Sequence, residues 1–159
     1  MINKENEPVL KFIRFCGEEI YPVINATCHI RKDKREDVYR LHFAIDADYG
    51  LVIHDDVEPL ESYPCWKLTH ITKEINKNDL QKGLKIEMPI GDDKERVEYI
   101  SILHYSEAEQ VDNNIIEILD VKDDKYLIRI TGETIDVNYL SRSRPQMKLF
   151  IETWFEYIE

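Results

Sequence analysis

The stretch 126–157 constrains the fold most, because apolar and polar residues alternate along most of it. Side chains of a β-strand point to opposite faces with period two, so this alternation predicts strands with one buried face. The apolar positions are even-numbered up to Ile130 and odd-numbered from Ile135 onward. A strand changes parity only through an inserted residue or a turn, and Gly132 permits either. We therefore predict a bulge or sharp bend near Gly132, with a tight turn as the alternative.

The segment 147–157 is expected to be the last strand, because it is rich in aromatic and β-branched residues. A helix is the alternative, since Phe150 and Trp154 are four residues apart. In a strand, the odd-numbered apolar residues face the core. Phe150 and Trp154 then lie on the opposite face with Glu152 and Glu156. A covering helix or second sheet is the more ordinary arrangement for such aromatics, and an exposed interaction surface is the other.

Further alternating runs predict most of the remaining fold. Residues 20–31 and 38–49 alternate around a charged turn at 33–36, which predicts a β-hairpin with Ile20, Pro22, Ile24 and the following even positions on its core face. Strands are also expected at 9–16, 84–90, 96–105 and 114–121, and a helix at Cys65–Asn78 from the spacing of Leu68, Ile71 and Ile75. The fold class is therefore mainly β: an antiparallel β-sandwich or partly open barrel of about eight or nine strands with one short helix.

Length and composition indicate one soluble globular domain over residues 1–159. The chain is 43% hydrophobic and 33% charged, as in globular proteins, and has no apolar run long enough to span a membrane. Its first residues are polar, without an apolar signal region, so the expected location is the cytoplasm. Cys16, Cys28 and Cys65 are far apart in the sequence, which predicts reduced and mostly buried thiols.

The formal net charge of −11, from 32 acidic and 21 basic residues, limits the possible partners. Such a surface repels nucleic-acid phosphates and anionic lipids, so neither is an expected partner. It favours a basic protein partner, or it serves only to keep the protein in solution.

Motifs of common enzymes and cofactor sites are absent from the sequence. It contains no phosphate-binding loop, dinucleotide fingerprint, zinc-protease motif or nucleophile elbow. No cofactor is therefore expected, and an enzyme is the less favoured class. Cys65, with His70 nearby and His54-Asp55 upstream, has the residue types of a thiol nucleophile, but a buried structural cysteine is the favoured interpretation.

Two groups of residues suit a metal. His29 and His42 are expected to face each other across the first hairpin, with Asp46 on the same face. Calcium prefers converging carboxylates, which Asp46, Asp48, Asp55 and Asp56 supply if they gather at one end of a sandwich. Ordinary surface histidines and solvated acidic turns explain the same residues, so no metal ligand is assigned.

The leading functional hypothesis is a small acidic module that binds a basic protein, for example an inhibitor such as the immunity proteins of bacterial toxin systems. A calcium- or metal-binding β-sandwich is the alternative, followed by an enzyme whose site is assembled from His29, His42 and the loop 50–64. The oligomeric state is open. The residues expected to contact the partner are Phe150, Glu152, Trp154, Glu156, Asp55, Asp56 and Glu58.

Overall fold

The computed structural model describes residues 7–52, 62–137 and 146–159, which form β-strands and one 3-10 turn but no α-helix. This confirms the expected mainly β class. The elements are β1 (Val9–Arg14), β2 (Gly17–Asp33), β3 (Val38–Ala47), β4 (Leu51–Val52), β5 (Cys65–Thr72), the 3-10 turn η2 (Lys77–Asp79), β6 (Lys85–Met88), β7 (Asp92–Asp93), β8 (Glu98–Tyr99), β9 (Ser101–Tyr105), β10 (Glu107–Gln110), β11 (Asp112–Lys122), β12 (Lys125–Ile135) and β13 (Gln146–Tyr157).

Ten of these strands form one open sheet in the order β10-β9-β5-β3-β2-β1-β13-β12-β11-β6, with β4 paired to β2 beside this path. Neighbouring strands are antiparallel, apart from a two-residue parallel contact between β13 and β2. β7 and β8 form a separate hairpin. The strand expected at 96–105 is divided into β8 and β9, because the amides of Ile100 and Ser101 both donate to the Gly91 carbonyl at 2.8 and 3.0 Å.

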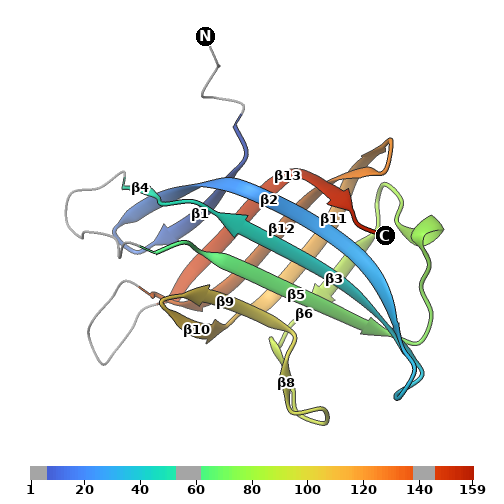
Figure 1. The fold of residues 1–159 in the computed structure, drawn as a ribbon. Coiled ribbons are helices and arrows are strands. Elements are labelled where there is room, and N and C mark those ends of the chain that lie inside the picture. Colours follow the sequence, from blue (N-terminus) through green and yellow to red (C-terminus); the bar gives the residue numbers. More distant parts are fainter. Residues whose placement is uncertain (1–6, 53–61, 138–145) are drawn as a thin grey trace.

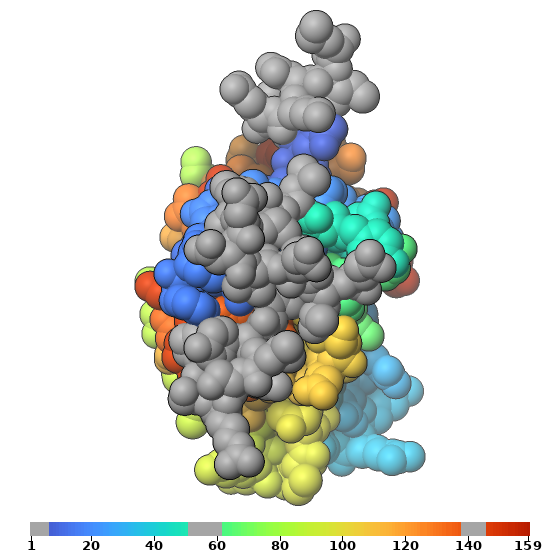
Figure 2. Space-filling model, turned by 90° about the vertical axis from the view of Figure 1, so that its left-hand side faces the viewer, coloured from blue at the N-terminus to red at the C-terminus, as the bar shows by residue number. Residues whose placement is uncertain are grey.

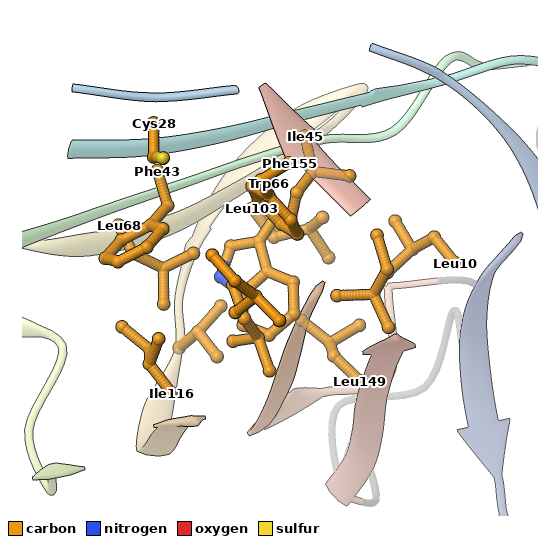
Figure 3. Packing of buried hydrophobic residues seen from close by; sticks show 14 of the residues in the cluster. Leu10, Cys28, Phe43, Ile45, Trp66, Leu68, Leu103, Ile116, Leu149 and Phe155 are labelled. Carbon is orange, nitrogen blue, oxygen red and sulfur yellow. The ribbon is translucent and has the colours of Figure 1, made fainter. Parts of the chain in front are cut away.

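The sheet bends so that β11, β12 and β13 lie behind β2, β3 and β5 (Figure 1). Apolar side chains from the two halves meet between them (Figure 3). Phe43 of β3 and Phe155 of β13 pack edge to face, with ring centroids 6.2 Å apart. Trp66 of β5 is fully buried in the middle of this core. One bent sheet thus supplies both walls of the hydrophobic core.

The predicted hairpin of residues 20–31 and 38–49 is confirmed as β2 and β3, but its core face is only partly as expected. Leu41, Phe43, Ile45 and Ala47 of β3 are buried. In β2 a register shift between Val23 and Asn25 leaves Ile24 57% exposed. On the N-terminal side of this bulge Glu19 and Tyr21 are buried, so the prediction that Ile20, Pro22 and Ile24 face the core is wrong.

The helix predicted at Cys65–Asn78 is also wrong, because residues 65–72 form strand β5. Every residue from Cys65 to Thr72 is paired with β3, and Trp66 and Leu68 point into the core with period two. Pairing and burial in the sheet therefore override a helical spacing that was already weakened by two threonines. The only described helix is the single turn η2, whose Asn76 cap accepts from the Asn78 amide at 2.9 Å.

Gly132 does not change the parity of its own strand. β12 pairs with β13 from Lys125 to Ile135 without a register shift, and its even positions stay buried through Thr134. The irregularity lies in the neighbouring strand, where the register of β11 shifts between Asp112 and Ile115, directly opposite Gly132. The bulge is therefore near the expected place but in the other strand.

The segment 147–157 is a strand, as expected, and its odd-numbered residues from Met147 to Phe155 are buried apart from Thr153. Cys28 is buried, whereas Cys16 and Cys65 are half-buried, and none of the three forms a disulfide. Among the described residues, no helix is long and apolar enough to cross a membrane.

Candidate functional site

The outer surface of β11, β12 and β13 carries three parallel rows of side chains, which we call the striped face. Its first row is Trp154, Leu127 and Asp120, its second is Glu152, Arg129 and Glu117, and its third is Phe150, Thr131 and Ile115. Residues within a row are directly opposite each other on neighbouring strands, so their side chains are in contact range. Two rows with apolar side chains thus enclose one charged row.

Trp154 is the large aromatic of this face, and 40% of its surface is exposed. It lies opposite Leu127 in the register of β12 and β13. A hollow of about 410 Å³ beside it is lined by Trp154, Lys122, Asp123 and Lys125. The indole is therefore accessible at the edge of a shallow depression, held by a strand that is paired on both sides.

Phe150 is half-buried, and lies between Lys11 of β1 and Thr131 of β12. Ile13 and Ile115 on the same outer surface are 36% and 37% exposed. The two predicted aromatics therefore both face outward, as expected for the strand. Trp154 is more accessible than Phe150.

The charged row is held together by Arg129. Its Nη2 lies 2.7 Å from Glu152 Oε1, and its Nη1 lies 3.9 Å from Glu117 Oε2. All three side chains are partly exposed, so each pair contributes only about 0.2–1 kcal/mol to stability. Two carboxylates share one guanidinium, which leaves the row with an excess of one negative charge.

The remaining predicted contact residues divide into two groups. Glu156 is exposed and lies opposite Lys125, next to the first row of the striped face. Asp55, Asp56 and Glu58 lie outside the described residues.

His29 and His42 face each other as predicted, with their rings stacked at a centroid distance of 4.7 Å. His42 Nδ1 lies 2.9 Å from Thr69 Oγ1. Burial, followed by the neighbouring His29, lowers the pKa of His42 to about 4. Asp46 is four residues farther along β3, and no group of three potential metal ligands occurs among the described residues.

Cys65 lacks the setting of a reactive thiol. Burial and the adjacent Asp46 raise its pKa to about 11, so the thiol stays protonated at neutral pH. His70 is five residues farther along the same strand. His54 and Asp55, the other members of this expected group, are outside the described residues.

Two of the acidic turns have local structural roles. Asp123 and Asp124 both have positive φ, 49° and 60°, and form the two-residue turn between β11 and β12. Asp124 also pairs with Lys77 at 3.1 Å.

Asp93 accepts from Arg96 at 2.8 Å, and Arg96 in turn pairs with Glu36. These contacts join the β7–β8 hairpin to the β2–β3 turn, which lie side by side in Figure 2.

A buried ionic cluster was not predicted from the sequence. Arg14 Nη1 pairs with Glu19 Oε1 at 2.6 Å, and Arg14 Nε pairs with Asp136 Oδ2 at 2.7 Å, with all three side chains almost fully buried. Tyr21 donates to Glu19 and lies 2.9 Å from the hydroxyl of Tyr105. Burial alone would lower the pKa of Arg14, but the hydrogen bonds to Asp136 and Glu19 hold it above its ordinary value. Arg14 Nη2 has no hydrogen-bond partner within the described part of the chain.

Comparison of the chain with protein-family models, curated proteins and solved structures finds no match. Function is therefore inferred from the chemistry of these surfaces alone. The buried cluster is enclosed, the histidine pair lacks a third ligand among the described residues, and the Cys65 thiol is protonated. The striped face combines accessibility with the residue types that are enriched in protein interfaces, namely tryptophan, phenylalanine and arginine.

Proposed function

We propose that the protein is an acidic protein-binding module and that its partner docks on the striped face. The observation that carries this proposal is Trp154, a 40% exposed indole on a paired strand with an apolar neighbour on one side and an ionic row on the other. Tryptophan and arginine are the side chains that most often dominate binding energy at interfaces. A paired strand also fixes their positions before binding, which lowers the entropy lost on association.

The partner is proposed to be basic. The chain carries a net charge of −11, and the central row of the striped face has two carboxylates for one guanidinium. A basic surface would find an unshared carboxylate there, while the net charge would speed its approach. One concrete form of this function is an inhibitor of the immunity-protein type, which neutralises a basic protein by covering it.

Affinity capture from the host lysate tests the proposal if variants of the striped face are compared with a variant outside it. The immobilised wild-type protein is compared with Trp154→Ala, Glu152→Lys and a control, Tyr99→Ala. Tyr99 is 57% exposed and lies on β8, away from the striped face. We expect a stoichiometric basic protein on the wild type and on Tyr99→Ala, and its loss from the other two variants. Capture that is unchanged by Trp154→Ala would refute the striped face as the docking surface.

A melting experiment separates this function from metal binding. A ligand that binds only the native state raises the melting temperature. We expect no shift of the wild-type melt with calcium or zinc. A rise with either ion would favour the metal-binding alternative.

A further inference from the structure

A second recess lies on a different part of the molecule, between β5 and β6. It has a volume of about 470 Å³, within the range of roughly 300–1,000 Å³ that is typical of small-molecule sites. Its wall is mostly apolar, with Val38, Met88 and Ile100 among the lining residues. None of its lining residues belongs to the striped face, so an inference about it does not rest on the function proposed above.

This recess exists because two strand edges remain without a strand between them. In β5, only Cys65–Leu68 pair with β9, whose other neighbour is β10. This contact ends where the Thr69 amide donates to the Ile100 carbonyl at 2.7 Å. Within the described residues, no strand pairs with the rest of β5 on that side, and β6 pairs only with β11. The recess therefore lies where the bent sheet stays open, a place comparable to the mouth of a β-barrel, where ligands commonly bind.

Two side chains that line this recess, His70 and Lys73, have no polar partner among the described residues. His70 has no side-chain hydrogen bond in the described part of the chain, and burial lowers its pKa, so its imidazole is neutral at pH 7. The Lys73 ammonium has no carboxylate within ion-pair distance among the described residues. By contrast, Glu87 pairs with Lys85 at 3.6 Å and Asp93 with Arg96 at 2.8 Å.

We propose that this recess binds a small amphipathic carboxylate, with its apolar body against Val38, Met88 and Ile100 and its carboxylate against His70 and Lys73. The imidazole N–H and the ammonium donate to the carboxylate, and such charge-assisted bonds are stronger than neutral ones. The apolar body leaves water, which supplies the non-directional part of the binding energy. An anion is selected although the whole protein is negative, because the other charged side chains lining this recess already have partners.

Octanoate and octanol are suitable probes, since they share an apolar body and differ in the head group. Binding is followed by titration calorimetry and by amide chemical shifts of the full chain. The key variant is Lys73→Gln, which removes the cation at an exposed position. Its matched control is Lys67→Gln, an exposed lysine of β5 that lies outside the recess, whereas Lys73 directly follows the end of that strand.

We expect saturable binding of octanoate, with shift changes at residues 69–73 and 87–90. Lys73→Gln should weaken octanoate about tenfold, the loss expected for one charge-assisted hydrogen bond, and leave octanol unchanged. Lys67→Gln should leave both probes unchanged. The proposal fails if octanoate does not saturate the wild type, if its shift changes map elsewhere, or if Lys73→Gln affects both probes equally.

Discussion

Gly132 of β12 lies so close to Asn114 of β11 that a Cβ at position 132 would come within 3.0 Å of Asn114 Oδ1. The same Cβ would approach Val111 Cγ1 to 2.6 Å and Trp66 Cζ2 to 3.0 Å. Gly132 does not have a positive φ, so the requirement for glycine there is close packing and not backbone conformation. The missing side chain makes room for the β11 bulge and for the indole in the core.

Replacing Gly132 with alanine is therefore expected to destabilise the protein by about 1–3 kcal/mol, the usual cost of adding a group to a packed core. The free energy of unfolding is measured by urea denaturation. Thr131→Ala is the control, because Thr131 is the adjacent residue on the outer face and its loss creates no clash. Equal stability of Gly132→Ala and wild type would show that the core relaxes around the added methyl group.

The fold class could be predicted because alternation survives in the long strands: β3, β12 up to Ile130, and most of β13 bury the residues that their parity indicates. What alternation does not reveal is a bulge. Ile24 belongs to the even-numbered apolar residues of β2, yet it is 57% exposed. The bulge between Val23 and Asn25 changes which residues face the core, from odd-numbered before it to even-numbered after it. The Gly132 prediction failed for a related reason, because Ile135 does not lie on the buried face of β12. Gly132, Thr134 and Asp136 are buried there instead.

A chain of buried side-chain hydrogen bonds connects the two halves of the core. Trp66 Nε1 donates to Ser101 Oγ at 3.0 Å, and Ser101 Oγ donates to Asn114 Oδ1 at 2.8 Å. Asn114 Nδ2 then donates to the carbonyls of Met88 and Val111, at 3.1 and 2.8 Å. Ser101 thus links Trp66 of β5, in one half of the sheet, to Asn114 of β11, in the other half.

Ser101→Ala is expected to cost about 1–3 kcal/mol of unfolding free energy, because it leaves buried polar atoms of Trp66 and Asn114 without this partner. Ser101→Thr keeps the hydroxyl and is the conservative variant for comparison. Urea denaturation followed by tryptophan fluorescence reports both stability and the indole environment. An alanine variant as stable as the wild type would indicate that water replaces the serine hydroxyl.

Removing Arg14 alone is expected to destabilise the protein more than removing the charges of Arg14, Glu19 and Asp136 together. Arg14→Met removes the guanidinium from between Glu19 and Asp136, and breaking such a buried pair costs about 3–5 kcal/mol. The variant Arg14→Met with Asp136→Asn and Glu19→Gln, in which no charge remains, should recover part of this loss. A triple variant less stable than Arg14→Met would show that the acids are stabilised by neighbours other than Arg14.

The candidate site could be predicted in part. Phe150, Glu152 and Trp154 were placed on the outer face correctly, since parity holds along β13. Arg129 and Glu117 were missed because the pairing of strands is not visible in one sequence. Asp136 was missed because the odd-numbered apolar residues from Ile135 onward predict that it faces outward. Arg14 did carry a signal, because it continues the buried parity of β1 after Leu10 and Phe12. A charged residue at such a position indicates a buried ion pair, but its partner becomes known only from the fold.

His42 is expected to make stability depend on pH between about 4 and 6.5. Its pKa is lowered from 6.5 to about 4, first by burial and then by His29, so in this range the unfolded chain binds a proton that the folded chain does not. Unfolding is then favoured as pH falls from 6.5 towards 4, and the contribution of His42 to stability is fully present above 6.5.

The variant His42→Gln keeps a polar group near Thr69 but cannot titrate, so its free energy of unfolding should decrease less steeply between pH 6.5 and 4. His70, whose pKa is also lowered by burial, remains in the variant and should preserve part of the slope. Parallel pH profiles of wild type and His42→Gln in urea denaturation would contradict a buried, neutral His42.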